Sequence, residues 1–128
     1  MKLNEFFEEL QQEYHINLNT TAYSVASIFV NNKWTVFFKE LESPVFIIYT
    51  NLCPLSANQK EAFYEEILKV NLYGTQTDGI AFGLDEKNQM IVQYYRFEQE
   101  PASYKEVSNK LKKFIGVAER YKQIFEKF

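Results

Sequence analysis

The side chains best suited to nucleophilic or metal chemistry are scarce in this chain. His15 is the only histidine and Cys53 the only cysteine. A zinc site needs about four N, S or O ligands at suitable spacing, and this inventory cannot build the usual ones. A Cys–His pair is formally open, but no flanking signature supports it, and Cys53 fits better as a small buried apolar residue. We therefore expect no metal and no other cofactor.

Carboxylates are plentiful, but most occupy positions typical of solvated helix faces and turns, although a catalytic pair could still meet in space. Gly79 and Gly83 stand alone, without a phosphate-binding loop or a dinucleotide fingerprint. No serine lies in a nucleophile-elbow context. The sequence therefore favours a protein that binds over one that catalyses. The carboxylates considered are Glu8, Glu9, Glu65, Glu66, Asp78 and Asp85.

Length and charge limit the class of protein further. The chain has 128 residues, the usual size of one domain, so we expect a single domain over residues 1–128. Residues 1–103 carry seven Lys or Arg against fourteen Asp or Glu, a net charge of −7, whereas residues 104–128 carry +4. An acidic body argues against nucleic acid, which is bound largely through Lys and Arg. The basic end suits the dipole of a final helix better than a dedicated acidic partner.

Cysteine content and hydropathy indicate the compartment. One cysteine permits no intrachain disulfide, which fits a reducing environment. The first residues are interrupted by acids and lack a signal-peptide core. No stretch approaches the ~20 apolar residues that a membrane span needs. We therefore expect a cytoplasmic protein without membrane insertion. Aromatic residues make up 17% of the chain, an excess that serves either a core or an interface.

Periodicity predicts the elements that position any binding residues. Apolar residues at spacings of three and four indicate helices at residues 3–14 and 104–125, and a further helix after residues 54–56. Short β-prone runs between turn signals indicate strands. Two pairs fit the capping-box spacing, Ser56 with Gln59 and Ser103 with Glu106. The predicted strands lie at residues 23–30, 34–41, 45–49, 80–85 and 90–95.

The predicted fold class is α+β, in the order helix, three strands, helix, two strands, helix. Runs of adjacent strands favour a mainly antiparallel twisted sheet with helices packed against it. The middle helix has a wide apolar stripe, which indicates either deep burial or contact with a second subunit. Ala81 and Gly83 leave one strand face nearly bare, so another backbone can come close there.

Three stretches in residues 63–97 make the chain resemble a known family. Residues 63–72 look like a second helix that typically ends in a Leu-x-x-Asn-Leu-like sequence. Residues 79–85 look like a small-residue strand that ends in an acidic turn, and residues 90–97 look like the returning strand. The chain resembles the Tir-chaperone-like family, the class I chaperones of type III secretion, and its element order agrees.

The resemblance implies an ATP-independent chaperone and a homodimer without nucleotide. Its partner would be the N-terminal segment of a secreted effector, kept extended, soluble and secretion-competent, with strand addition and side-chain pockets supplying affinity. The implied dimer interface contains Phe63, Ile67, Leu72, Ile80 and Phe82. The partner-binding candidates are Phe7, Phe29, Trp34, Phe38 and Ile48, for each of which burial in the core is the competing interpretation.

Two other functions stay open at this point. One is a regulatory or adaptor domain of the same fold that binds a folded partner and has no secretion client. The other is an enzyme or small-ligand binder that uses a cleft beside the sheet. The latter predicts a sizeable pocket with convergent polar groups and a titratable residue of perturbed pKa.

Overall fold

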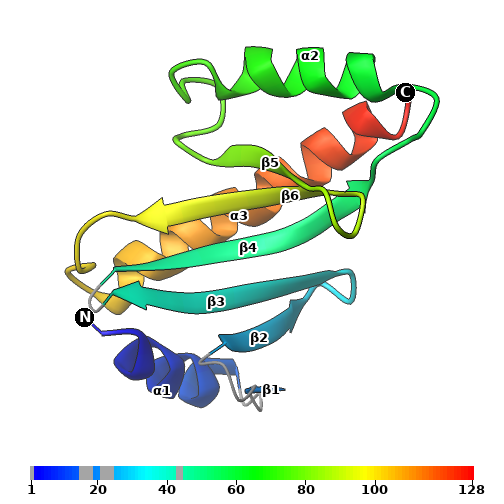
Figure 1. Cartoon of the computed structure of the whole chain (residues 1–128). Helices are drawn as coiled ribbons and strands as arrows, with labels where there is room; N and C mark the ends of the chain where they lie inside the picture. The colour runs from blue at the N-terminus through cyan, green and yellow to red at the C-terminus, as the bar shows by residue number, and fades with distance from the viewer. Residues whose placement is uncertain (1, 15–18, 21–24, 43–44) are drawn as a thin grey trace. The chain divides into compact units, whose positions relative to one another are not determined.

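The structure is a computed structural model that describes residues 2–14, 19–20, 25–42 and 45–128 (Figure 1). The predicted order of helices and strands is confirmed, with one additional two-residue strand. The sheet has the hydrogen-bonding order β1-β2-β3-β4-β6-β5. The elements are α1 (Leu3–Tyr14), β1 (Asn19–Thr20), β2 (Val25–Val30), β3 (Trp34–Glu42), β4 (Val45–Pro54), α2 (Lys60–Asn71), β5 (Ala81–Asp85), β6 (Met90–Phe97) and α3 (Tyr104–Phe125).

The chain divides into two compact units, and each is described by itself. Unit 1 comprises Met1–Tyr49 and Arg96–Lys112, and unit 2 comprises Thr50–Tyr95 and Lys113–Phe128. Three elements, β4, β6 and α3, contribute residues to both units. A single domain over residues 1–128 stays a prediction. His15 and part of the strand expected at residues 23–30 lie outside the described residues.

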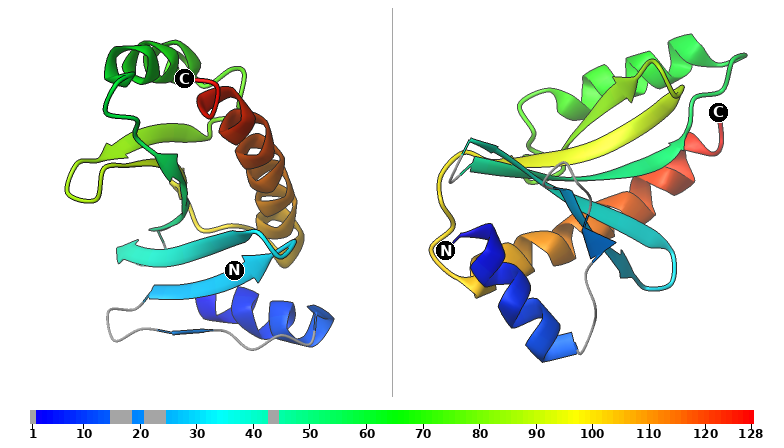
Figure 2. Two further views of the ribbon diagram at one scale, coloured as in Figure 1. Left: turned by 90° about the vertical axis from the view of Figure 1, so that its right-hand side faces the viewer. Right: turned by 60° about the horizontal axis from the view of Figure 1, so that its bottom comes forward.

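Unit 1 is built on antiparallel strands. The turn after β2 places Asn31 and Asn32 at positive φ, and Val30 then pairs with Trp34. As predicted, Trp34, Val36 and Phe38 lie on one buried face of β3. In Figure 2, α1 and the first half of α3 lie on this same face of the unit. The ring of Phe6 in α1 contacts Phe38 at 5.7 Å between centroids, so the helix is anchored by its apolar stripe.

The strand β4 is longer than its apolar run indicates. The predicted strand ends at Tyr49, whereas β4 continues to Pro54. Thr50 and Asn51 interrupt the apolar sequence, but both fit a strand whose faces differ in burial. The expected coverage of both faces is only partial, because Phe46 and Ile48 are buried while their neighbours are half-buried. Packing of neighbouring elements therefore outweighs the local sequence signal.

Unit 2 contains the antiparallel β5–β6 hairpin, in which Asp85 pairs with Met90 across the predicted turn. The second half of α3 presents a buried stripe, as its spacing predicts: Phe114, Ala118, Tyr121 and Phe125. Phe125 stacks on Phe63 of α2 at 5.6 Å between ring centroids. Phe82 of β5 lies 5.1 Å from Tyr121. Aromatic contacts between α2, β5 and α3 thus form the core of this unit.

One of the two predicted capping boxes is wrong. The second helix begins at Lys60 with Gln59 as its N-cap and no side-chain cap, and Ser56 accepts only a backbone hydrogen bond, from the N–H of Gln59. At α3 the hydroxyl of Ser103 accepts a hydrogen bond from the N–H of Glu106 at 3.3 Å. The Glu106 carboxylate accepts one from the N–H of Ala102 at 2.7 Å, one residue earlier than the usual box.

Candidate partner-binding surfaces

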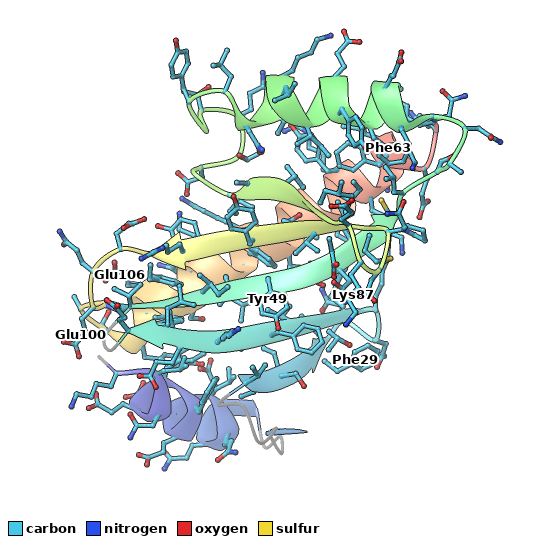
Figure 3. All side chains as sticks on the ribbon, in the orientation of Figure 1. Phe29, Tyr49, Phe63, Lys87, Glu100 and Glu106 are labelled. Atoms are coloured by element: carbon cyan, nitrogen blue, oxygen red, sulfur yellow. The ribbon has the colours of Figure 1, made fainter. Side chains whose placement is uncertain are left out.

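The outer face of the unit 1 sheet carries aromatic side chains. Phe37 of β3 and Tyr49 of β4 are cross-strand partners, and their rings stack at 5.0 Å with an interplanar angle of 17°. Phe29 of β2 is 62% exposed and pairs with the exposed Thr35. Figure 3 shows Phe29 and Tyr49 projecting from the sheet. We call Phe29, Phe37 and Tyr49 the outer aromatic face.

The outer aromatic face combines apolar area with a hydrogen-bonding group. The Tyr49 hydroxyl can both donate and accept a hydrogen bond, and burial raises its pKa above the ordinary value. An exposed phenylalanine beside a stacked pair is typical of a surface that meets another protein. In an extended segment, side chains alternate between faces, so every second residue of such a segment could contact these rings.

The other partner-binding candidates lie on the opposite, buried face of unit 1. Trp34, Phe38 and Ile48 are almost fully buried. Phe7 of α1 is half-buried and meets Phe38 edge to face, with ring centroids 5.2 Å apart. The structure therefore brings Phe7, Trp34, Phe38 and Ile48 into one core and leaves Phe29 on the other side of the sheet. Core burial, the competing interpretation, describes Trp34, Phe38 and Ile48 in the isolated chain, whereas Phe7 is only half-buried.

An open hollow lies between α1 and the start of α3, also in unit 1. Its volume is about 430 Å³, and its lining includes Glu9, Glu13 and Tyr104. The Tyr104 hydroxyl donates a hydrogen bond to the Glu13 carboxylate, and the Tyr104 ring stacks on Phe6 at 5.2 Å. Two carboxylates beside an aromatic ring suit a cationic side chain.

In unit 2 the predicted dimer residues separate into two groups. Phe63, Ile67, Ile80 and Phe82 are buried within the chain, whereas Leu72 is 59% exposed. Other apolar side chains of α2 and the residue after it are also exposed. Residues 64 and 68 are four positions apart and so share one side of α2, and Leu72 follows directly after its last residue. We call Tyr64, Leu68, Leu72 and Tyr73 the exposed α2 face.

The one cysteine is unsuited to nucleophilic work. Cys53 is buried, and burial, aided by the negative charge of Glu126, raises the pKa of its thiol to about 11. Since the thiolate is the nucleophile, Cys53 is almost wholly unreactive at neutral pH. Within the described residues, no group of three His, Cys, Asp or Glu side chains lies close enough to hold a metal ion.

A family comparison decides what these surfaces belong to. Residues 3–122 match the model of the Tir chaperone protein (CesT) family. The chain belongs to this family. The match extends well beyond residues 63–97, on which the resemblance was recognised. It confirms that resemblance and the chaperone class of function that it implies.

Solved structures share the same fold. A chain in the ExsC–ExsE complex is similar with a TM-score of 0.79 at 16% identity, and 98% of this chain and 97% of that chain are covered. The HopA1–SchA chaperone–effector complex gives a TM-score of 0.71 at 13% identity, with 94% and 95% covered. The Yersinia pestis type III secretion chaperone SycH, in complex with a fragment of YscM2, gives 0.68 at 14% identity, with 91% and 96% covered. No curated protein sequence matches the chain.

Several features of these surfaces escaped sequence reasoning. Phe37 and Tyr49 are predicted as strand residues, but their pairing depends on the register between β3 and β4. The hollow joins Glu9 and Glu13 to Tyr104, which lies 91 residues after Glu13. One sequence signal for the outer aromatic face did exist: aromatic residues occupy both faces of the strand predicted at residues 34–41, so one set of rings had to lie away from the core.

In the part of the chain that the structure describes, no helix is long and apolar enough to cross a membrane.

Proposed function

We propose that this protein is an ATP-independent secretion chaperone that binds the N-terminal segment of a secreted effector and keeps it extended and soluble. The observation that carries the proposal is the outer aromatic face, an uncovered apolar surface in a member of a chaperone family. One similar structure is itself a chaperone–effector complex, which supports the same role here. An extended segment supplies the backbone and alternating side chains that a sheet surface can bind.

Within this proposal, some of the partner-binding candidates in unit 1 contact the client directly and the others support them from the core. Phe29 is exposed and half-buried Phe7 is near the surface, so both are available to a partner. Trp34, Phe38 and Ile48 form the supporting core that holds β2, β3 and β4 in position. The hollow beside Tyr104 would take a basic residue of the client, because Glu9 and Glu13 line it.

The proposed assembly is a homodimer formed through α2 and the neighbouring β5. Leu72 is the exposed member of the predicted set, and Tyr64, Leu68 and Tyr73 extend the apolar surface around it. Phe63, Ile67, Ile80 and Phe82 pack beneath and support the helix. A second copy of the chain would remove these exposed side chains from water, at roughly 25 cal/mol per Å² of apolar area.

The proposed chaperone works in the cytoplasm and catalyses no reaction. Its affinity would come from buried apolar area and hydrogen bonds and not from nucleotide turnover. Cys53, the chain's only thiol, is held in its unreactive protonated form, which agrees with this view. The hollow beside Tyr104 is open to solvent, unlike the enclosed pockets in which most enzymes hold a small substrate.

Affinity purification from the native host tests this function. The tagged wild type should retain a protein whose N-terminal segment is necessary and sufficient for binding, without added ATP. Phe29→Ser should weaken binding of that segment at least about tenfold, since burial of a phenylalanine is worth about 1.5–3 kcal/mol. Leu84→Ser, which removes an exposed apolar side chain of unit 2, is the matched control. A partner that binds only as a folded domain would favour the regulatory or adaptor role instead.

A further inference from the structure

The outer edge of β5 is a place where another strand could add. β5 is the last strand in the hydrogen-bonding order, after β6. An edge strand exposes backbone N–H and C=O groups that can pair with another chain. In a protein that binds extended segments, the client itself could pair with an exposed strand edge, because an extended segment has the backbone conformation of a strand. The residues that lie along this edge therefore bear on which segments the protein binds, and where.

The side chain of Asn71 occupies this edge at Phe82. Its amide nitrogen donates a hydrogen bond to the backbone carbonyl of Phe82 at 2.8 Å. Its amide oxygen accepts one from the backbone N–H of Phe82 at 2.9 Å. A side-chain amide has the same donor and acceptor as a peptide group, so Asn71 pairs with Phe82 as a neighbouring strand would. Figure 1 shows the last turn of α2 and the connection after it above β5, on the side away from β6.

Thr77 pairs with the backbone of Ile80, two residues before Phe82 on the same edge. The backbone N–H of Ile80 donates to the carbonyl of Thr77 at 3.1 Å, and the Thr77 hydroxyl donates to the carbonyl of Ile80. Thr77 is buried, so these bonds are shielded from water. In an antiparallel strand, alternate residues direct their backbone groups to the same side. Ile80 and Phe82 are such alternate residues, and both are already paired within the chain.

The connection between α2 and β5 is built to hold these two side chains in place. The N–H of Gly79 donates to the carbonyl of Gly74 at 3.0 Å. Both glycines have positive φ, and a Cβ at Gly74 would lie 3.2 Å from the Cα of Gly79. Glycine combines this conformation with this close approach at the lowest cost, since it has no Cβ. The tight connection between residues 72 and 79 thus fixes Asn71 and Thr77 against β5.

We propose that Asn71, with Thr77, closes the first part of the outer edge of β5, at Ile80 and Phe82, to strand addition and is a specificity-determining residue of this chaperone. Neither a client segment nor a second copy pairs with β5 at this edge. A second copy therefore meets this end of unit 2 through the side chains of the exposed α2 face. A client strand is directed to other parts of the sheet. The role in client choice rests on the proposed function, whereas the closed edge is a property of the chain itself.

The experiment uses the full-length protein without any client. Asn71→Ala removes both bonds to Phe82, and Asn88→Ala, which removes a side-chain bond to Asp85 in the exposed β5–β6 turn, is the matched control. Hydrogen exchange should show the Phe82 amide exchanging about five- to tenfold faster in Asn71→Ala, because its acceptor is gone. Light scattering coupled to size exclusion should show species larger than those of the wild type. Asn88→Ala should change neither measurement.

A second substitution separates edge pairing from simple loss of stability. Leu84→Lys places a charge on the same strand, and charged side chains discourage edge-to-edge pairing. The double variant Asn71→Ala/Leu84→Lys should return to the wild-type size while the Phe82 amide stays fast. If Asn71→Ala does not fold, Asn71→Asp replaces it; this variant keeps the acceptor for the Phe82 N–H and loses only the donor to the Phe82 carbonyl, so its readout is molecular size. Unchanged Phe82 exchange in Asn71→Ala, the absence of larger species, or larger species that Leu84→Lys does not remove overturns the proposal. A monomeric wild type would contradict only the proposed dimer.

Discussion

The side-chain nitrogen of Gln93 donates a hydrogen bond to the backbone carbonyl of Phe114 at 2.9 Å, inside unit 2. Gln93 is completely buried on β6, and Phe114 is completely buried on α3. The side-chain oxygen of Gln93 has no hydrogen-bond partner within the described part of the chain. A buried polar group therefore ties a strand to a helix, at the cost of one unsatisfied acceptor.

Replacing Gln93 should show whether the hydrogen bond to Phe114 stabilises the fold more than the unsatisfied side-chain oxygen destabilises it. Gln93→Met should change the free energy of unfolding by less than about 1 kcal/mol, because it removes both the bond and the unsatisfied oxygen. Gln93→Glu should destabilise by at least about 2 kcal/mol at neutral pH, since the carboxylate must either be buried as a charge or take up a proton in the core. Urea unfolding of both variants measures the difference. Equal destabilisation by the two substitutions would show that the hydrogen bond itself dominates.

Two glycines should respond to alanine in opposite directions. Gly116 is exposed in α3, and no atom lies within 4 Å of the position that a Cβ would take, so Gly116→Ala should stabilise by about 0.5–1 kcal/mol. Gly74 has a φ of +66°, and a Cβ there would lie only 3.2 Å from the Cα of Gly79, so Gly74→Ala should destabilise by more than about 1 kcal/mol. Thermal or urea unfolding gives both values. A destabilising Gly116→Ala would indicate a contact absent from the isolated chain.

The Cys53 thiol should make folding sensitive to alkaline pH. Its pKa is about 11 in the folded chain, raised above its ordinary value of 9.0 by burial and then by the charge of Glu126. The unfolded chain therefore loses this proton first, and the thiol's contribution to stability is lost as pH rises from about 9 to about 11. Cys53→Ala should show a smaller loss of stability between pH 8.5 and 10.5. An identical pH profile in both proteins would contradict the raised pKa.

Charge on the exposed α2 face should dissociate the proposed dimer. Leu68 is 72% exposed in the single chain, so Leu68→Glu should leave folding intact. A carboxylate buried in an apolar interface is strongly unfavourable, so the variant should be monomeric where the wild type is dimeric. Light scattering at several concentrations measures the mass. Leu41→Glu, at an exposed position of β3 in unit 1, is the control and should keep the wild-type mass.

Sequence periodicity predicts the elements of this fold because each helix and most strands bury one regular face. The stripe from Val107 through Phe114 to Phe125 specifies α3 by itself, and the alternation after Trp34 specifies β3. The position of Leu72 at the surface depends on where α2 ends, which local sequence marks poorly. Local sequence also marks the start of α2 poorly. Ser56 has a side chain suited to capping, but only its backbone carbonyl accepts a hydrogen bond, from Gln59, and the helix begins at Lys60.

The relationships that define the surfaces depend on contacts between distant residues. The bond between Asn71 and Phe82 spans eleven residues and requires the connection after α2 to fold back on β5. The stack of Phe37 on Tyr49 depends on strand register, and a shift of one residue would turn either ring to the other face. The sequence shows the aromatic excess, but only the structure divides it between a core and an uncovered face.

Binding of an extended segment of another protein can be measured by calorimetry with the purified N-terminal segment of a co-purifying partner, as an unfolded peptide and without nucleotide. We expect saturable binding with a negative heat-capacity change, weakened at least about tenfold by Phe29→Ser and unchanged by Leu84→Ser. Binding that requires the partner's folded domain, or that is indifferent to Phe29→Ser, would contradict it.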